Sequence, residues 1–308
     1  MAEEVLSFAC EGETLVGILS RPARPAPVGV VIIVGGPQYR AGSHRQFVLL
    51  ARALAAQGHA VLRFDYRGMG DSTGALRTFE AVEADVAAAI AAFRQAVPEL
   101  QGVALWGLCD GASAALMYWQ HTRDAQVLAL CLANPWLRSG QTHARTQIKH
   151  YYLQRLKDPA FWKKLLSGKV ARSAVAGLMQ SLRAARGGDA APLKPAGDQA
   201  AARSSLPFTE RMAMAWKAFP GPILLLISGR DLTAAEFLEG CQTRSDWAGA
   251  LAQPNVTRID LPDADHTFSE AVQARAADGH TIAWLERQLG GPRTATLAAQ
   301  AAGAVPAA

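Results

Sequence analysis

The sequence predicts an α/β fold in which a mostly parallel, eight-stranded sheet is flanked by helices. Short apolar runs such as 28–34 and 102–106 alternate with longer amphipathic or alanine-rich segments, as is typical of parallel sheets. These apolar runs are continuous, which indicates strands that are buried on both faces. Half of the 308 residues are hydrophobic, so the chain can bury one large core.

The expected strands and helices alternate along the chain. The first two strands surround Glu11-Gly12-Glu13 and form an antiparallel hairpin, and a proline-rich connector then leads into the first buried strand. The eight expected strands are 5–9, 14–20, 28–34, 60–64, 102–106, 127–133, 222–228 and 255–260. The helices expected between and after them are 44–57, 78–96, 112–119, 234–250 and 269–289.

The alternation of strands and helices breaks after residue 137. No strand is evident from there to residue 218, and the segments 150–156, 161–166 and 174–182 have helical patterns. We therefore expect an insertion within one large domain. The expected division is a core of 1–137 and 219–290, a helical cap at 138–218 and a disordered tail at 291–308.

The cysteine content and the chain start indicate the compartment. The four cysteines form no CxxC pair and have no metal-ligand spacing, which favours a reducing compartment over a disulfide framework. The first residues are acidic and are followed by no apolar signal region. No apolar run approaches the roughly 18 residues that span a bilayer. We expect a cytoplasmic protein with no transmembrane segment, no metal and no cofactor.

A Gly-x-Cys-x-Gly motif at residues 107–111, here called the cysteine elbow, joins a predicted strand to a predicted helix. This is the layout of a nucleophile elbow, with Cys109 in the place usually taken by serine. The glycines allow a sharp turn, and the N-terminus of the helix beside the sulfur favours the thiolate. The alternative is a buried cysteine in an ordinary strand–glycine–helix turn, and the motif alone leaves both interpretations open.

A thiol nucleophile requires a base and a group that orients the base. Asp231 directly follows the seventh expected strand, and His266 lies in the loop after the last one. With Cys109 they stand in the order nucleophile, acid, histidine, each at the C-terminal end of a strand, where sites of parallel sheets assemble. Asp263 and Asp265 are rival orienting groups, although neighbouring loop residues seldom reach back to their own histidine. The sequence predicts the triad of Cys109, His266 and Asp231.

These motifs together resemble the α/β-hydrolase superfamily. The segments that carry the resemblance are Gly35-Gly36, 65–72, the cysteine elbow, 228–231 and Asp265-His266. More narrowly, segments 35–45, 134–136 and 150–162 resemble the exosortase A system-associated hydrolase 1 group. Members of that group occur beside exopolysaccharide and protein-sorting genes in Gram-negative bacteria. The resemblance implies an α/β-hydrolase fold with a helical cap and a hydrolase activity, and it supplies no substrate.

The resemblance also implies an oxyanion donor after the first parallel strand, where many relatives carry His-Gly-x. Here that position reads Gly35-Gly36-Pro37, and Pro37 has no N–H group. The donor is therefore expected in the segment 36–38, here called the oxyanion loop, as the N–H of Gln38 or Gly36. Its partner is expected to be the N–H of Asp110.

Positive charge gathers in the predicted cap. Residues 138–186 hold eleven Lys or Arg and one acidic residue, whereas the whole chain has a net charge of only +5. This asymmetry favours an anionic partner, such as a CoA or carrier-protein thioester, an acidic glycan or a phospholipid surface. No nucleic-acid-binding motif accompanies it. The residues considered as substrate contacts are Arg40, His44, Arg45, Tyr151 and Trp162. For each of them a solvated or packed side chain is the alternative.

The sequence thus predicts acyl transfer through a cysteine. The first hypothesis is a hydrolase of an ester or thioester that forms an acyl-enzyme and is linked to exopolysaccharide or exosortase systems. A cysteine elbow also occurs in some acyl-CoA acyltransferases, so the second hypothesis is an acyltransferase that uses the same acyl-cysteine. The third is a non-enzymatic hydrolase-fold partner. The expected substrate is a small acyl compound, and the oligomeric state stays open.

Overall fold

One mixed sheet forms the centre of the described part of the chain, which comprises residues 1–36, 38–137 and 206–289 of a computed structural model. Eight strands lie within these residues and belong to the same sheet. They are β1 (Ala2–Cys10), β2 (Glu13–Arg21), β3 (Val28–Ile33), β4 (Val61–Phe64), β5 (Gly102–Leu108), β6 (Val127–Ala133), β7 (Ile223–Ser228) and β8 (Val256–Leu261).

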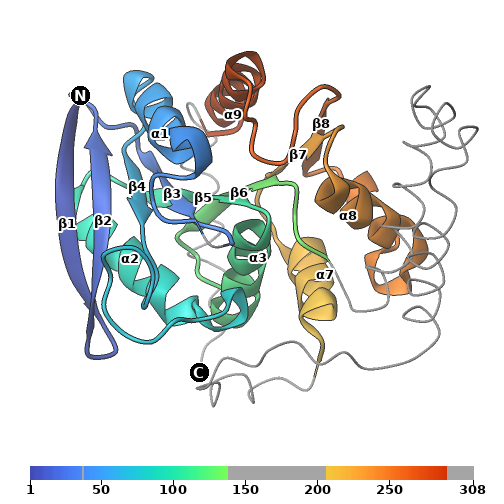
Figure 1. Cartoon of the computed structure of the whole chain (residues 1–308), viewed down its shortest axis with the longest axis horizontal. Helices are drawn as coiled ribbons and strands as arrows, with labels where there is room; N and C mark the ends of the chain where they lie inside the picture. The colour runs from blue at the N-terminus through green and yellow to red at the C-terminus, as the bar shows by residue number, and fades with distance from the viewer. Residues whose placement is uncertain (37, 138–205, 290–308) are drawn as a thin grey trace, which may run out of the picture. The chain divides into compact units, whose positions relative to one another are not determined.

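The strands pair in the spatial order β1-β2-β4-β3-β5-β6-β7-β8 (Figure 1). The hairpin of β1 and β2 and the pair of β2 with β4 are antiparallel, and the other neighbours are parallel. The predicted eight-stranded, mostly parallel sheet and its antiparallel N-terminal hairpin are therefore confirmed.

The register places the ends of the parallel strands level with one another. Leu108 at the end of β5 pairs with Ala133 at the end of β6, and Ser228 at the end of β7 pairs with Leu261 at the end of β8. Residues that follow these strands therefore meet at one edge of the sheet, where ligand sites of open parallel sheets form.

Helices cover both faces of the sheet. Those in the described residues are α1 (Gln46–Ala56), α2 (Glu83–Ala96), α3 (Asp110–Thr122), α7 (Phe208–Ala218), α8 (Leu232–Thr243) and α9 (Ala271–Leu289). Helices α1 and α9 lie side by side on one face, and α2, α3 and α7 pack together on the other (Figure 1).

Aromatic side chains fill the core on both sides of the sheet. Strands β3, β5, β6 and β7 are buried along their whole length, which explains why their sequences are continuous apolar runs. Phe47 of α1 packs edge-on against Trp106 of β5, with ring centroids 5.9 Å apart. On the other face, Trp119 of α3 meets Phe219 at 5.0 Å. Burial of each such side chain stabilises the fold by about 1.5–3 kcal/mol.

All five expected helices have different ends in the structure, where α3 is Asp110–Thr122 instead of 112–119 and α9 is Ala271–Leu289 instead of 269–289. The helix expected at 44–57 begins at Gln46, because His44 and Arg45 have positive φ values of 53° and 61° and cannot continue a right-handed helix. The helix expected at 78–96 starts as a separate 3₁₀ turn, Phe79–Ala81, before α2. The helix expected at 234–250 is shorter: α8 ends at Thr243, and two 3₁₀ turns follow, Ser245–Trp247 and Ala250–Ala252.

Helix α7 lies within the range expected for the cap, but it packs against the helices that cover the sheet. It contacts α3, and its Trp216 donates a hydrogen bond from Nε1 to the carbonyl of Ala250 at 2.9 Å. By its contacts the chain divides into two compact units, one of Met1–Trp136 with Gly197–Ala308 and one of Leu137–Ala196. Residues 138–205 and 290–308 lie outside the described residues, so the cap at 138–218 and the tail at 291–308 stay predictions.

None of the helices within the described ranges combines the length and the apolar composition that a membrane span requires.

Candidate active site

Cys109 occupies a strained turn between β5 and α3. Its φ of 60° and ψ of −126° lie in a region that residues other than glycine rarely adopt, at a cost of about 1–3 kcal/mol. The N–H of Cys109 donates to the carbonyl of Ala133 at 2.9 Å, and its own carbonyl accepts from Ala112 and Trp136, both at 3.1 Å. Hydrogen bonds to neighbouring segments therefore hold the strained residue in place.

Both glycines of the cysteine elbow are required by close backbone approaches. A Cβ atom on Gly107 would lie 2.5 Å from the carbonyl of Gly111. A Cβ atom on Gly111 would lie 2.4 Å from the carbonyl oxygen of Ile33. Since real Cβ atoms do not approach so closely, only glycine lets α3 start this near to β3 and β5. The spacing of the motif thus has a physical cause in the packing of the turn.

His266 lies next to Asp231 across the ends of β7 and β8. Its Nδ1 is 2.8 Å from Oδ2 of Asp231. The Asp231 side chain is only 5% exposed, and that of His266 is 33% exposed. The Asp231 carboxylate also accepts from the N–H groups of Thr233 at 3.0 Å and Ala234 at 3.2 Å. Asp231 is therefore both the N-cap of α8 and the partner of the imidazole.

His266 also interacts with Cys109, so the three predicted triad residues lie together. Burial lowers the pKa of His266, but the hydrogen bonds and charges of Asp231 and Cys109 outweigh burial and raise this pKa to about 10. The surroundings of the imidazole therefore favour its protonated form, between the carboxylate of Asp231 and the sulfur of Cys109. The thiolate is the form of a cysteine that acts as a nucleophile.

The rival orienting group Asp265 has other partners. Its carboxylate accepts hydrogen bonds from the backbone N–H groups of Thr267 at 3.2 Å and Ser269 at 2.9 Å, and from the hydroxyl of Ser269. These bonds hold the loop that carries His266. Asp265 therefore shapes this loop, while the bond to the imidazole comes from Asp231.

Asn134, directly after β6, is a site residue that the sequence analysis did not single out. It is completely buried, with a φ of 44°. Its Nδ2 donates to Ser228 Oγ at 2.9 Å and to the carbonyl of His266 at 3.3 Å, and its Oδ1 accepts from the N–H of Ser228 at 2.8 Å. It ties the end of β7 to the loop that carries His266. The available signal was a polar side chain directly after a buried strand, at the edge where the triad residues also stand.

In the oxyanion loop, the N–H of Gly36 donates to Oδ1 of Asp110. Burial raises the pKa of the Asp110 carboxyl, and the N–H groups of Gly36, Asp110 and Gly111 oppose this rise. The N–H of Gln38 has no acceptor among the described residues, while its side chain accepts from Ser43 at 3.4 Å and Gln46 at 3.1 Å. Of the two expected donors, Gly36 is thus already occupied and Gln38 is not.

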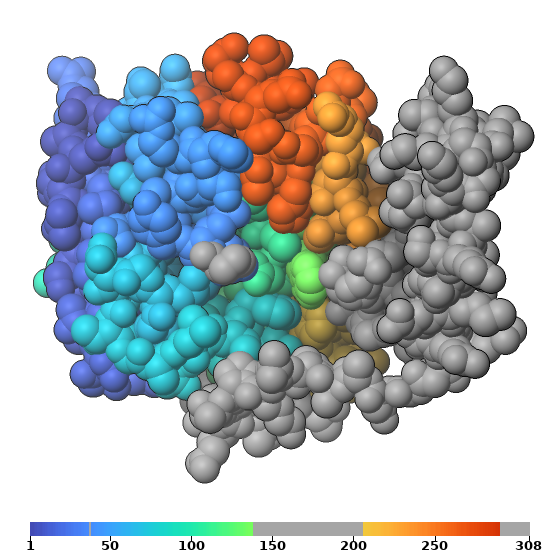
Figure 2. All heavy atoms as spheres, viewed as in Figure 1, coloured from blue at the N-terminus to red at the C-terminus, as the bar shows by residue number. Residues whose placement is uncertain are grey.

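Segments that are far apart in the chain meet at this site. Figure 2 shows the light-blue segment near residue 40, the green segment that follows β5 and the orange C-terminal segment next to one another on the face viewed.

The family model described as the Alpha/beta hydrolase family matches residues 30–278, which is most of the chain.

This chain belongs to the alpha/beta hydrolase family.

Solved structures share the fold of this alpha/beta hydrolase at low sequence identity. The esterase Pf2001 of Pyrococcus furiosus is 16% identical, with a TM-score of 0.61 and 94% of both chains covered. Est1E of Butyrivibrio proteoclasticus with bound ferulic acid is 14% identical, with a TM-score of 0.58 over 92% of this chain and 99% of that one. XC6422 of Xanthomonas campestris, an α/β serine hydrolase without a lid, is 16% identical with a TM-score of 0.53 over 93% and 95%. No curated protein matches the sequence.

The five residues considered as substrate contacts have separate outcomes in this hydrolase. The guanidinium of Arg40 forms ion pairs with Asp65 and Asp71, so its charge is balanced within the protein instead of being offered to a ligand. His44 and Arg45 form the turn before α1 and are exposed. Tyr151 and Trp162 lie outside the described residues, so their contacts stay predictions.

The other three thiols of the described residues are buried. Cys10, Cys131 and Cys241 are buried and unpaired, and burial raises the pKa of each, that of Cys241 to about 12. Within the described ranges, no three His, Cys, Asp or Glu side chains gather in a way that would hold a metal ion.

Proposed function

We propose that this alpha/beta hydrolase cleaves an ester or thioester with Cys109 as the nucleophile. The observation that carries the proposal is the position of His266, which contacts Cys109 and lies 2.8 Å from the buried carboxylate of Asp231. A nucleophile, a base in contact with it and a third group that orients the base are the parts that covalent acyl transfer requires.

The proposed reaction has two halves. The Cys109 thiolate attacks the carbonyl carbon, a C–S bond forms, and the carbonyl electron pair moves to oxygen. The N–H groups of Gln38 and Asp110 bind this oxyanion. Collapse of the intermediate breaks the bond to the leaving group, which takes the proton of His266. Water then attacks the acyl-cysteine and gives its proton to His266, and release of the acid restores the thiolate and the imidazolium.

Asp231 has two tasks in this scheme. Its hydrogen bond to Nδ1 leaves Nε2 of His266 as the nitrogen that faces Cys109 and the leaving group. Its negative charge stabilises the imidazolium that persists until the leaving group takes the proton. An orienting carboxylate of this kind contributes up to about 10⁴-fold in a serine triad.

The substrate class is proposed from two further observations. One of the proteins that share the fold, Pf2001, is named as an esterase, which favours simple esters as the first compounds to test. The eleven basic residues of 138–186 favour an acyl donor with an anionic leaving group, such as a CoA or carrier-protein thioester. If an amine or a sugar replaces water in the second half-reaction, the same acyl-cysteine supports acyl transfer. The proposed link to exopolysaccharide or exosortase systems rests on the sequence motifs alone.

Intact-protein mass spectrometry with a panel of p-nitrophenyl esters and acyl-CoA thioesters tests the proposal. We expect the mass to rise by one acyl group on Cys109, and His266→Gln to slow loss of that group. Cys109→Ala should abolish both turnover and the mass increase. Full turnover by Cys109→Ala would refute Cys109 as the nucleophile. Addition of candidate acceptors to the acylated protein separates hydrolysis from acyl transfer by the mass of the product.

A further inference from the structure

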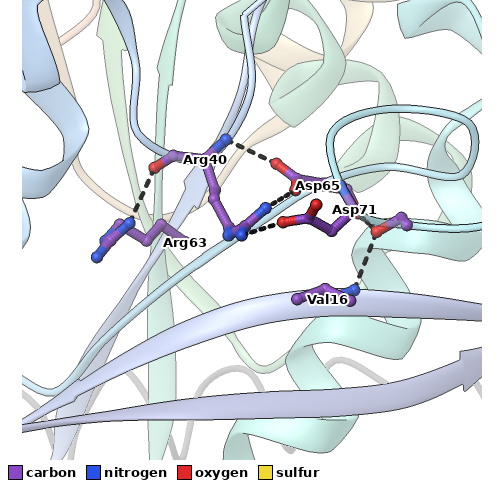
Figure 3. Close-up of polar contacts among 6 residues, drawn as sticks. Val16, Arg40, Arg63, Asp65 and Asp71 are labelled. Atoms are coloured by element: carbon purple, nitrogen blue, oxygen red, sulfur yellow. Dashed lines mark hydrogen bonds and ion pairs between the residues drawn. The ribbon is translucent and has the colours of Figure 1, made fainter.

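Asp65 is a buried carboxylate whose main partner is Arg40. It follows β4 and is only 1% exposed. The backbone N–H of Arg40 donates to its Oδ1 at 2.6 Å, and the guanidinium of Arg40 donates to its Oδ2 (Figure 3). Asp65 therefore binds both the main chain and the side chain of one residue, and that residue lies two positions after Gln38.

The remaining groups of Arg40 are fixed as well. Its carbonyl accepts a hydrogen bond from Nη1 of Arg63 at 3.3 Å, and its second guanidinium nitrogen pairs with Asp71 (Figure 3). The Arg40 side chain is only 16% exposed. The N–H, the carbonyl and the side chain of Arg40 are thus all held by residues of β4 or of the turn after it.

Asp65 is itself anchored to the sheet. Its carbonyl accepts from the hydroxyl of Ser72 at 2.8 Å, and the same hydroxyl oxygen accepts from the N–H of Val16 in β2 at 2.9 Å. The N–H of Asp71 donates to Asp65 Oδ2 at 3.2 Å. A Cβ atom on Gly70 would lie 2.1 Å from Oδ2, so the space around the carboxylate is closed. Through Asp65, Arg40 is therefore attached to the central sheet.

A second carboxylate holds the other end of the same segment. The N–H of Gly36 donates to Asp110, which belongs to the cysteine elbow. Segment 36–40 is thus attached at one end to the elbow and at the other end to β4. Gln38 lies between these two attachments, and its N–H has no acceptor in the described part of the protein. The two carboxylates therefore hold Gly36 and Arg40 on either side of Gln38.

We propose that Arg40 and Asp65 are positioning residues that hold the oxyanion loop, so that the N–H of Gln38 meets the developing oxyanion. This inference rests on the proposed function, because it requires an acyl substrate at Cys109. An oxyanion donor acts only if it is held within a fraction of an ångström, and misplacement by about 1 Å can cost about 100-fold in rate. Because the oxyanion exists in the transition state and not in the bound substrate, the loss should fall on kcat and spare KM.

Two reactions of the same sulfur test the proposal. Acylation by a p-nitrophenyl ester passes through an oxyanion, whereas alkylation by iodoacetamide displaces iodide directly and forms none. We expect Arg40→Ala to lower kcat for the ester about 10- to 100-fold, with KM changed less than about threefold. The rate of Cys109 alkylation should stay within about twofold, and Arg40→Lys, which restores a cation for Asp65, should recover part of kcat.

Arg244→Ala is the matched control. Arg244 forms a half-buried ion pair with Asp246 at 2.8 Å, and α8 separates it from Asp231 by about 18 Å at 1.5 Å per residue. This variant should keep the ratio of the acylation rate to the alkylation rate.

The ratio of the two rates also identifies the results that would overturn the proposal. An unchanged ratio in Arg40→Ala, or an equal fall of both rates, would mean that the Arg40–Asp65 pair does not act on the oxyanion loop. If Arg40→Ala does not fold, Asp65→Asn decides, since its amide oxygen still accepts from the N–H of Arg40. In Asp65→Asn, a ratio of acylation rate to alkylation rate that is lowered at least about fivefold supports the proposal, and an unchanged ratio overturns it. Absence of acyl-Cys109 in the natural protein would instead refute the proposed function itself.

Discussion

At the scale of single residues, the proposed reactivity of Cys109 depends on the charge of His266. The pKa of this histidine is raised to about 10 in the folded protein from an ordinary value of 6.5. Because the folded pKa is the higher one, the ion pairs of His266 stabilise the fold fully below about pH 6.5. This contribution is lost as the pH rises through about 10.

Iodoacetamide labelling across pH measures this coupling. In the natural protein Cys109 should react rapidly at pH 7, because the protonated His266 lies beside its sulfur. In His266→Gln the rate at pH 7 should fall about tenfold, because this variant lacks the neighbouring cation. Peptide mass spectrometry identifies the labelled residue.

The buried cysteines are the internal control for this labelling. Cys10, Cys131 and Cys241 should stay unlabelled in the folded protein, since burial raises the pKa of each thiol. Labelling of all four cysteines at one rate, or a His266→Gln variant that reacts like the natural protein, would contradict an activated thiolate.

Gln38 permits a test of the backbone donor, because a side-chain change and a backbone change can be compared at one position. Gln38→Ala keeps the N–H group and should retain most of the activity. Gln38→Pro removes the N–H group and should lower kcat about 100-fold or more. Steady-state kinetics with one ester, together with the melting temperature, measures this difference. A folded Gln38→Pro variant with full turnover would place the oxyanion donor elsewhere.

At the scale of the secondary-structure elements, the start of α8 combines stability and chemistry in one side chain. Asp231 accepts two backbone N–H groups as an N-cap and also binds His266. The N-cap of α8 and the proposed catalytic carboxylate are thus the same side chain. The two roles can be separated because an amide still caps a helix, whereas it carries no charge.

Two substitutions at Asp231 should therefore give different results. Asp231→Asn should keep the cap but lose the ion pair with His266, and it should lower kcat about 100-fold or more. Asp231→Ala should lower kcat as well, and its free energy of unfolding should lie about 1 kcal/mol below that of Asp231→Asn through loss of the cap. Urea denaturation and steady-state kinetics measure the two effects. An Asn variant with natural kcat would leave Asp231 only its capping role.

At the scale of the whole molecule, the parallel order of β5, β6, β7 and β8 creates the site. Cys109, Asn134, Asp231 and His266 follow these four strands and come from widely separated parts of the chain. Since the strand ends are level, residues that follow them reach one another without long loops. The distribution of charge is the other property of the whole chain that bears on function.

The basic segment 138–186 should affect charged substrates selectively. If its positive charge binds an anionic leaving group, KM for an acyl-CoA thioester should rise about tenfold or more between 50 and 500 mM salt, because salt screens such attraction. KM for a neutral p-nitrophenyl ester should change less than about twofold and serves as the control. Equal salt dependence of both KM values would assign the charge to solvated surface.

The sequence by itself determined the fold class and the triad candidates. Buried parallel strands appear as continuous apolar runs, because both faces of each strand are covered, and this pattern is local. The cysteine elbow is also a local motif. Gly107 is required by the backbone of the turn itself, whereas Gly111 is required by its approach to Ile33 of β3. The chain order of Cys109, Asp231 and His266 then followed from the rule that residues after parallel strands share one edge.

Only the tertiary structure decided what depends on contacts between distant residues. Asp110 comes from another element and occupies the N–H of Gly36, which leaves Gln38 as the free donor. Arg40, which the sequence analysis considered as a substrate contact, forms ion pairs with Asp65 and Asp71 instead. Asn134 joins β7 to the loop that carries His266 across 132 positions in the chain. The packing of the elements determines which groups form hydrogen bonds of this kind. A local pattern of neighbouring residues does not show which distant residue will accept a given N–H or pair with a given charge.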